Sequence, residues 1–312
     1  MTSPPSVQDF PEARADARAE ARIYVAYHDA RPVLGGRHLV PIQVGRALTG
    51  VLLPGVAGDD TGDNLSRLNP EYCELTAHYW AWRNDPADAP MGLMHYRRLF
   101  DLGGRQPARS HPERHVARFD AAAWAQDVDR HVAGAGRSDL VVPRPIRLRR
   151  SLARQYGRCH DPSHLRALRA VAAERRPDFA PALDRVLGGN RLLLGNMFIM
   201  PRPVFDHYSA LLFPILAETR ARIAAAGPGS GYQARYPGFL AERILTAYVL
   251  GGHARAAFPD LRVVHKTVLN IDATGPAAAG WPHLLRLCLE RRIGLGDAWT
   301  LGTGRSRNRT AR

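Results

Sequence analysis

Residues 58–100 carry the strongest structural signals of the chain, because an acidic turn, a helix with clear end signals and a short buried strand follow one another there. The helix is the most constrained part. Asn69 suits the N-cap, Pro70 suits the first helical position, and Glu71 lies in the first turn, where the helix dipole favours an anion. The sequence therefore predicts a helix that begins at Asn69 and ends near Asn84.

This helix has two distinct faces. One face is apolar and is made of residues at three- and four-residue steps, namely Tyr72, Leu75, Tyr79 and Trp82. Glu74 and His78 lie one turn apart on another face. These two side chains either look into a cleft or form an ordinary pair on the helix surface.

A short apolar run at residues 91–94 follows the helix and is bounded by turn-forming residues, which indicates a buried strand. The four residues after it are His95, Tyr96, Arg97 and Arg98. In open α/β sheets ligands gather at the carboxyl ends of the strands, and two guanidinium groups there suit the oxygens of a diphosphate. The alternative is a solvated basic loop in an arginine-rich protein.

The rest of the chain alternates between apolar runs of strand and of helix type. Strands are expected at residues 23–27, 139–143 and 261–269, and helices around residues 121–132, 165–171, 179–187, 203–216, 244–249 and 281–289. Between residues 40 and 58 the spacing of Ile42, Val44 and Leu48 favours a short helix, with a small strand near Leu52. His28 follows the first expected strand directly. These elements predict an α/β protein.

An acidic loop with two glycines, Gly58 and Gly62, contains Asp59, Asp60 and Asp63. Carboxylates in such a loop suit ribose hydroxyls or a divalent cation, and they equally suit the hydrogen bonds of turns and helix caps. The residue types alone do not choose between these roles.

Two later polar residues stand out because they interrupt apolar segments. Asn196 lies inside an apolar run, so its amide is either hydrogen-bonded within the core or presented to a substrate. Glu242 precedes an apolar helical run and can face a cleft. A carboxylate so placed is a candidate general base for an acceptor hydroxyl, and the neighbouring Arg243 could hold a phosphate. The alternative is an internal pair between Glu242 and Arg243.

Several short segments, in their order and spacing, resemble one bacterial protein family. The segments are IYVAYH (residues 23–28), VPIQVG (40–45), GDDTGDNLS (58–66), NPEYCELTAHYWAWRN (69–84), GLMHYRRLF (92–100), RQY (154–156) with His160, GNMFIM (195–200) and GFLAER (238–243). Across residues 23–250 the chain resembles the family known as domain of unknown function 4422, whose members occur among glycosyltransferases of capsular and exopolysaccharide biosynthesis.

The resemblance implies a Rossmann-related α/β fold similar to the GT-A type, with a mixed sheet flanked by helices and a helical C-terminal part. It also implies transfer of a sugar from a nucleotide-sugar donor, which we expect to be a UDP-sugar, to a glycan or lipid-linked glycan acceptor. Some relatives are associated with galactofuranosyl transfer. The resemblance leaves the donor sugar of this chain open.

The resemblance also suggests roles for individual residues. Glu242 is the expected catalytic residue. The expected donor-binding residues are His28, Asp59, Asp60, Asp63, Asn64, Glu74, His95, Arg97 and Arg98. The expected residues of the acceptor or donor-sugar side are Gln155, Tyr156, His160, Asn196 and Arg243.

A bound Mn²⁺ or Mg²⁺ ion would have Asp59, Asp60 and Asp63 as its candidate ligands. Transferases of the GT-A type commonly carry an Asp-x-Asp pair after a central strand, whereas this chain has His95 and Arg97 at that place. Imidazole and guanidinium are poor ligands for hard cations but suit phosphate oxygens. We therefore expect a metal-independent mechanism.

Charge leaves two other function classes open. The formal net charge is +14, and Lys266 is the single lysine, so the excess is arginine. Such a charge favours acidic partners, including nucleic acid, although an Ala- and Arg-rich coding bias would produce the same composition. The densest cluster, residues 144–154, either touches a membrane surface or is a solvated face. The alternatives to a transferase are a nucleic-acid-binding protein and a catalytically silent scaffold of a polysaccharide assembly complex; we expect no specific nucleic acid.

Length and composition set the remaining expectations. The 312 residues can hold one α/β domain with additions, and no unbroken apolar run is long enough for a membrane span. Residues 1–21 are expected to be a flexible lead, residues 22–290 the transferase-like domain, and residues 291–312 a basic tail. No signal peptide is visible, so the expected location is the cytoplasm, with peripheral contact at the inner membrane. The cysteines Cys73, Cys159 and Cys288 have no metal-ligand spacing.

Overall fold

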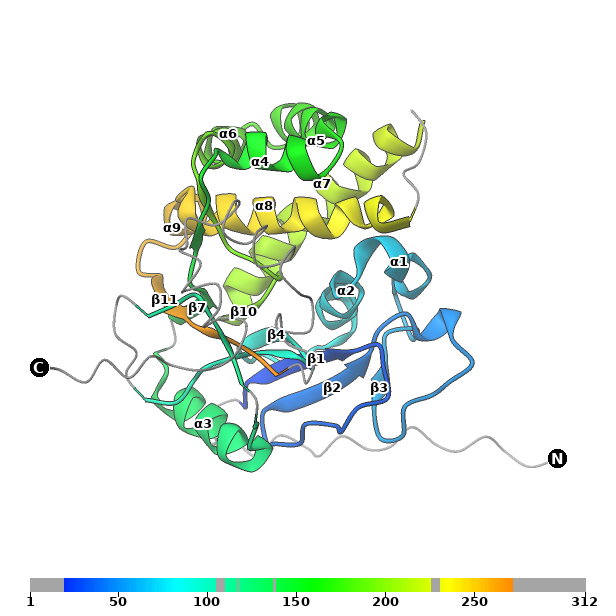
Figure 1. The fold of residues 1–312 in the computed structure, drawn as a ribbon, viewed down its shortest axis with the longest axis vertical. Coiled ribbons are helices and arrows are strands. Elements are labelled where there is room, and N and C mark those ends of the chain that lie inside the picture. The colour runs from blue at the N-terminus through cyan, green and yellow to red at the C-terminus, as the bar shows by residue number, and fades with distance from the viewer. Residues whose placement is uncertain (1–19, 105–109, 117, 137–138, 226–230, 272–312) are drawn as a thin grey trace, which may run out of the picture.

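The computed structural model describes residues 20–104, 110–116, 118–136, 139–225 and 231–271. Its centre is a ten-stranded mixed sheet that has helices on both faces (Figure 1). The main path of the sheet runs in the order β11-β7-β10-β4-β1-β2-β3. The fold is therefore α/β, as the sequence predicts.

Three parallel strands form the middle of the sheet: β1 (Arg22–Tyr27), β2 (Leu39–Gln43) and β4 (Met91–His95). Side chains of β1 alternate between the two faces, since Tyr24 packs into one hydrophobic core and Val25 into the other. Gly92 of β4 allows close packing against β1, because an added Cβ would lie 3.0 Å from a side-chain carbon of Ile23. The three strands therefore hold their carboxyl ends at a common edge.

The other strands extend this centre on both sides. They are β3 (Ala57–Gly58), β5 (Arg98–Phe100), β6 (Glu113–His115), β7 (Asp139–Pro143), β10 (Phe198–Met200), β11 (Arg262–Lys266) and β12 (Val268–Asn270). Strand β10 is antiparallel to both β4 and β7, whereas β11 is parallel to β7. A separate antiparallel pair consists of β8 (Ile146–Arg147) and β9 (Arg191–Leu192).

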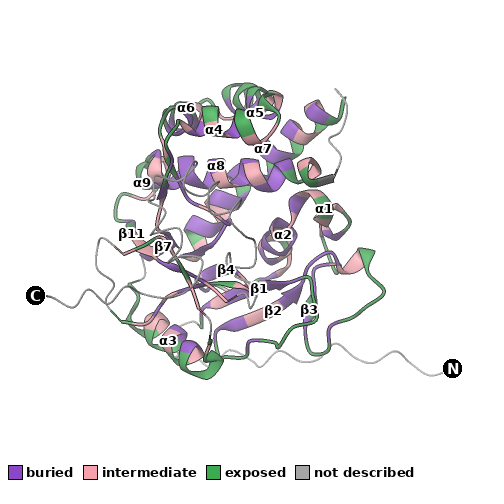
Figure 2. Ribbon diagram, in the orientation of Figure 1, coloured by how far each residue is buried: buried purple, intermediate pink, exposed green. Residues whose placement is uncertain are grey.

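The helices form a thick layer on one face of the sheet and a thin one on the other (Figure 1). The thick layer contains α1 (Asn69–Tyr72), α2 (Leu75–Asn84), α4 (Leu152–Cys159), α5 (Pro162–Arg175), α6 (Ala180–Gly188), α7 (Arg202–Ala225), α8 (Tyr236–Leu250) and α9 (His253–Ala257). The thin layer is α3 (Ala121–Gly134), whose Trp124 and Val128 are buried. Figure 2 shows the purple, buried inner faces of α7 and α8 between the sheet and the outer helices.

The segment that the sequence predicts as one helix from Asn69 to Asn84 is two helices, so this prediction is wrong. Cys73, between α1 and α2, has φ 54° and ψ −129°, which breaks the helical path. The side-chain amide of Asn69 donates to the carbonyl of Cys73 at 2.7 Å and to Oγ1 of Thr76 at 3.2 Å. Asn69 therefore bridges the break instead of capping the helix start.

The segment between residues 40 and 58 also differs from its prediction. Ile42 belongs to β2 and Leu48 to a 3₁₀ turn, η1 (Arg46–Leu48). Leu52 is exposed and lies outside any strand. Ile42 is buried because β2 pairs with β1 inside the sheet, so its burial does not reflect a helical face.

Most other predicted elements are confirmed. Strands at residues 23–27, 91–94 and 139–143 and the helices from 121 to 249 lie where expected, while the predicted strand 261–269 is divided into β11 and β12. The predicted helix at 281–289, the tail at 291–312 and all but two residues of the 1–21 lead fall outside the described residues. Within the described ranges, no helix combines the length and apolar character needed to cross a bilayer.

Candidate active site

A cavity of about 680 Å³ lies at the carboxyl ends of β1 and β4, and α1, α4 and α8 contribute to its walls. Its volume is in the range of small-molecule sites. Residues expected to form the site line it, namely His28, Glu74, His95, Arg97, Arg98, Gln155, His160, Asn196, Glu242 and Arg243. The fold thus brings together side chains that are distant in the sequence, from His28 to Arg243.

Glu242, on α8, is held in a fixed orientation in this cavity. Its Oε1 accepts a hydrogen bond from the backbone nitrogen of Gly195 at 2.8 Å, and its Oε2 lies 2.8 Å from Nη1 of Arg243. The side chain is only 15% exposed. Burial raises the pKa of Glu242, while the positive charge of Arg243 and the Gly195 amide oppose that rise.

Asn196 lies beside Glu74 on the same side of the cavity. Its Nδ2 donates to Oε1 of Glu74 at 2.7 Å and to the carbonyl of Gly238 at 3.2 Å. Both amide hydrogens are therefore used. The acceptor Oδ1 is buried without a hydrogen-bond partner among the described residues, and Asn196 as a whole is 2% exposed. An unpaired buried acceptor in a cavity wall is suited to a ligand hydroxyl.

The turn that carries Asn196 is tied to the strand edge through His95. Gly195 and Asn196 have φ values of 85° and 51°, a backbone conformation that residues other than glycine rarely adopt. The Gly195 carbonyl lies 2.7 Å from Nε2 of His95, and since a carbonyl only accepts, Nε2 donates. Burial lowers the pKa of His95, which favours the neutral ring. The turn thus connects β4 to α8.

The basic side of the cavity follows β4. Arg97 stacks over Tyr96, with 5.1 Å from its guanidinium carbon to the ring centroid, and Arg98 is exposed. The Tyr96 hydroxyl donates to Asp29 at 2.8 Å, and this bond is the largest cause of the lowered pKa of Asp29. Asp29 in turn lies 3.0 Å from Nδ1 of His28. The chain Tyr96–Asp29–His28 therefore fixes the polar rim at the end of β1.

Arg243 mainly organises its neighbours. Its Nη1 donates to the Phe239 carbonyl at 2.9 Å, and its Nη2 donates to Oε1 of Gln155 at 2.9 Å. The residue is 2% exposed and its guanidinium carbon lies 5.2 Å from the ring centroid of Tyr156. Tyr156 itself is fully buried and does not line the cavity. This cation therefore holds Glu242 and Gln155 in place, which differs from the phosphate contact that the sequence suggests for it.

Cys73, Tyr232 and Arg235 are among the cavity residues that the sequence did not identify as site residues. Nε of Arg235 lies 3.1 Å from Sγ of Cys73, and its guanidinium carbon lies 5.7 Å from the Tyr232 ring centroid. His160, which was predicted, stacks on Phe239 with 4.3 Å between ring centroids. The only sequence signal for Arg235 is its place between a glycine-rich loop and the GFLAER segment.

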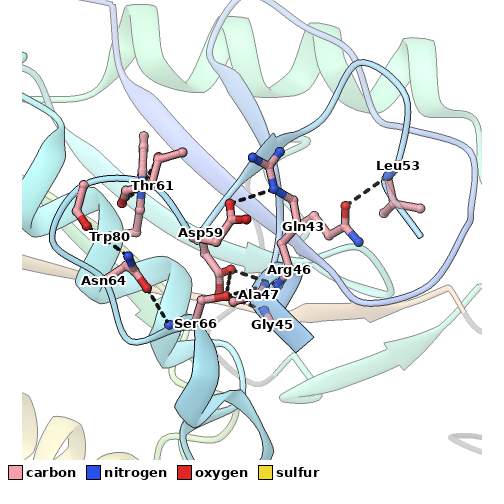
Figure 3. Close-up of polar contacts among 12 residues, drawn as sticks. Gln43, Gly45, Arg46, Ala47, Leu53, Asp59, Thr61, Asn64, Ser66 and Trp80 are labelled. Carbon is pink, nitrogen blue, oxygen red and sulfur yellow. Dashed lines mark hydrogen bonds and ion pairs between the residues drawn. The ribbon is translucent and has the colours of Figure 1, made fainter. Parts of the chain in front are cut away.

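The acidic loop lies outside the cavity lining. Figure 3 shows the polar contacts of this loop, including those of Asp59. Asp59 is completely buried, and its carboxylate accepts hydrogen bonds from the backbone nitrogens of Gly45 (2.8 Å) and Arg46 (3.1 Å) and from the Ser66 hydroxyl. Asp60 pairs with Arg46 at 2.7 Å. These bonds hold the loop that follows β2.

Asp63 and Asn64 have similar local partners. Asp63 pairs with Arg83 at 2.7 Å and accepts from the Tyr79 hydroxyl at 3.1 Å. Asn64 accepts from the backbone nitrogen of Ser66 at 3.2 Å. Because these oxygens already have partners, the donor set does not fit a cation. Within the part of the chain that the structure describes, no group of three or more His, Cys, Asp or Glu side chains is arranged to hold a metal ion.

Glu74 and His78, which the sequence places on one helix face, have different environments in the structure. Glu74 lines the cavity, but His78 is buried among aromatic rings, with Nε2 2.8 Å from Oγ of Ser209. Burial lowers the pKa of His78 to about 3, so the ring is neutral. The break at Cys73 places Glu74 at the start of α2, which separates the two side chains.

Comparison with known proteins identifies the family of the chain. Residues 22–253 match the family described as a domain of unknown function, DUF4422. The chain belongs to this family. A solved structure of the apo form of the bifunctional glycosyltransferase WbbM is similar to it, with a TM-score of 0.70 and 25% sequence identity. The match covers 81% of this chain but only 45% of that chain, so this protein spans less than half the length of its structural relative.

The similarity defines the fold type. The ten-stranded sheet with flanking helices is the GT-A-like fold that the sequence resemblance implies. No curated protein matches the chain significantly. The family and the fold are therefore established by one family match and one structural relative.

Proposed function

We propose that this protein is a glycosyltransferase that moves a sugar from a nucleotide-sugar donor to a glycan acceptor. The observation that carries the proposal is that one cavity contains both a buried carboxylate with a raised pKa, Glu242, and the guanidinium groups that follow β4. A general base can take the proton of an acceptor hydroxyl, and an anion site can stabilise the leaving diphosphate in direct displacement from a sugar nucleotide. The structural relative is itself named a glycosyltransferase.

In the proposed mechanism Glu242 is the base. An acceptor hydroxyl attacks the anomeric carbon of the donor sugar, its proton passes to a carboxylate oxygen of Glu242, and the bond from the anomeric carbon to the diphosphate breaks. A raised pKa makes the carboxylate a stronger base. The hydrogen bond from Gly195 and the pair with Arg243 keep the carboxylate in one orientation.

Arg97 and Arg98 neutralise the leaving diphosphate in this mechanism. A guanidinium presents two parallel N–H groups to phosphate oxygens and stays charged at any relevant pH. No step is routed through a metal ion, because the candidate aspartates are engaged in loop hydrogen bonds. His28, at the end of β1, lies where the nucleoside of the donor is expected.

The transferred sugar is placed against Asn196 and Glu74. The unpaired Oδ1 of Asn196 accepts a hydrogen bond from a sugar hydroxyl, and Glu74 supplies a second acceptor in the cavity wall. Gln155 and His160, on the α4 side, are assigned to the acceptor. The donor we propose is a UDP-sugar, with UDP-galactofuranose as the first candidate, and the acceptor a glycan or lipid-linked glycan of capsular or exopolysaccharide biosynthesis at the cytoplasmic face of the membrane.

The proposal is tested with a panel of UDP-galactofuranose, UDP-galactose, UDP-glucose and free UDP. A donor at about one hundred times its dissociation constant should stabilise the protein by about 2.7 kcal/mol in a thermal-shift measurement. The same donor should then release UDP with turnover when a glycan acceptor is added. Stabilisation without any turnover for all donors and acceptors would support a catalytically silent scaffold instead.

A further inference from the structure

Six exposed arginines lie close together on the β8–β9 pair and on α4. We call them the arginine strip: Arg147, Arg149, Arg150, Arg154, Arg158 and Arg191. Arg147 of β8 is directly opposite Arg191 of β9 in the antiparallel register. Arg154 and Arg158 are one turn apart on α4, and Arg149 and Arg150 form the link between β8 and α4. The strip therefore extends from β9 across β8 to α4, although Arg191 is distant from the other five along the chain.

Several exposed arginines elsewhere in the described residues pair with a carboxylate. Arg37, Arg114 and Arg175, for example, each pair with a carboxylate, at 2.7, 2.9 and 3.6 Å. No member of the strip pairs with a carboxylate of the described residues, and residues 140–160 contain no Asp or Glu. Apart from Arg191, the strip is thus a run of exposed arginines in a segment without carboxylates.

The strip also places like charges next to one another. Directly opposed like charges on paired strands destabilise the pair, and so do like charges one helical turn apart. Arg147 opposite Arg191 and Arg154 next to Arg158 are two such cases. An anionic partner that covers the strip would neutralise these charges and remove the repulsion. The described residues supply no carboxylate that does so.

The position of the strip relates it to the cavity. Ile146 and Leu148 line the cavity, and Arg147 and Arg149 alternate with them along the chain. On α4, Gln155 and Cys159 line the cavity while Arg154 and Arg158 are exposed. The strip is therefore the outer surface of the wall formed by β8 and α4.

We propose that the arginine strip docks the protein on the anionic surface of a lipid bilayer. A bilayer with anionic head groups is dense in negative charge, and each basic residue near it strengthens binding by roughly fivefold. Single-stranded nucleic acid is the less suitable partner, because its recognition uses exposed aromatic rings, and the aromatic residue within residues 147–158, Tyr156, is fully buried. Docking brings the cavity wall to the membrane, where a lipid-linked acceptor would be presented; that consequence alone rests on the proposed function.

The test compares two variants of the full chain that lose the same charge. The strip variant replaces four arginines by glutamine, namely Arg149, Arg150, Arg154 and Arg158. The control variant makes the same replacement at four exposed arginines that pair with carboxylates, namely Arg37, Arg114, Arg130 and Arg175. Co-sedimentation is measured with vesicles of phosphatidylcholine with and without phosphatidylglycerol. Circular dichroism and melting temperature confirm that both variants are folded.

Wild type and the control variant should bind the phosphatidylglycerol vesicles with affinities within about threefold of each other, and neither should bind phosphatidylcholine alone. The strip variant should lose binding by about a hundredfold or more. Equal losses in both variants would show a response to net charge and overturn the proposal. Absent vesicle binding together with tight, strip-dependent binding of a single-stranded RNA oligonucleotide would overturn it in favour of nucleic acid. Donor turnover is read separately, so failure of the transferase proposal is distinguishable from failure of docking.

Discussion

Glu242 on α8 accepts a 2.8 Å hydrogen bond from the backbone nitrogen of Gly195, in the turn before β10. The carbonyl of the same glycine accepts from Nε2 of His95 at the end of β4. The carboxylate is thus attached, through one peptide turn, to the strand edge that carries Arg97 and Arg98. This connection fixes the distance between the proposed base and the proposed diphosphate site, which a transfer reaction needs.

Removal of Arg243 should move the pH dependence of transfer. The positive charge of Arg243 lowers the pKa of Glu242, and burial raises it. In the Arg243→Met variant the opposing charge is lost, so the pKa of Glu242 should rise further and the acid limb of kcat/KM should shift to higher pH. A limb that stays in place in the folded variant would show that another group controls it.

The same pKa has a consequence for stability. A carboxylate whose pKa is higher in the folded than in the unfolded protein stabilises the fold below its unfolded pKa, and that contribution is lost as pH rises through the folded pKa. The free energy of unfolding of wild type should therefore decrease, relative to that of Glu242→Gln, as the pH rises just above the ordinary pKa of glutamate. Denaturant melts of both proteins across that interval measure the difference. Parallel curves would contradict the raised pKa.

Asn196 should contribute to the affinity for the donor sugar, and its left-handed backbone should reduce the stability of the fold. Both Asn196→Gly and Asn196→Ala remove the carboxamide, but only alanine keeps a Cβ at φ 51°. The glycine variant should be more stable than the alanine variant by about 1 kcal/mol, since left-handed backbone costs that much without glycine.

Both variants should bind the donor sugar equally weakly, roughly ten- to a hundredfold below wild type, because both lose the Oδ1 acceptor. Calorimetric binding of UDP-galactofuranose and of free UDP separates the two effects, since free UDP should bind all three proteins alike. Wild-type affinity of the glycine variant for the sugar nucleotide would remove Asn196 from the sugar site.

Asp59 should matter for the fold and not for a metal ion. Asp59→Ala deletes a buried carboxylate and leaves the amide nitrogens of Gly45 and Arg46 without their acceptor, at a cost of about 2–4 kcal/mol. Asp63→Ala breaks an exposed pair and should cost less than about 1 kcal/mol.

Turnover should persist in excess EDTA. The Arg97→Lys variant should have lower turnover, because lysine lacks the planar guanidinium fork. Activity that EDTA abolishes and manganese restores would return the acidic loop to a catalytic role.

The sequence predicted the parts of the site that depend on local patterns. The apolar strands of β1 and β4, with polar residues at their carboxyl ends, are readable from residue types, and His28, His95 and Arg97 line the cavity. Glu242 was chosen as a candidate because it precedes an apolar helical run and can face a cleft, and the family resemblance supported that choice.

Other features depend on contacts that are distant in the sequence. The positive φ of Cys73 divides the predicted helix, and neither a glycine nor a proline signals it. The carboxylates of Asp59 and Asp60 suited a metal site as a pattern, but Gly45, Arg46 and Ser66 provide their partners. Arg235 lines the cavity through a contact with Cys73, a residue far away along the chain. Such pairings follow from tertiary packing, which residue spacing does not encode.

The measurement that tests the central claim most directly is single-turnover transfer by wild type and by Glu242→Gln, with donor affinity measured on the same samples. Glutamine keeps the shape and can still accept from Gly195, but it cannot take a proton. Glu218→Gln, which alters a half-buried glutamate paired with Arg222 on α7, is the matched control. Wild type and the control should transfer sugar at similar rates, and Glu242→Gln should be slower by roughly two to four powers of ten with unchanged donor affinity. Transfer at the wild-type rate by a folded Glu242→Gln protein would contradict the account.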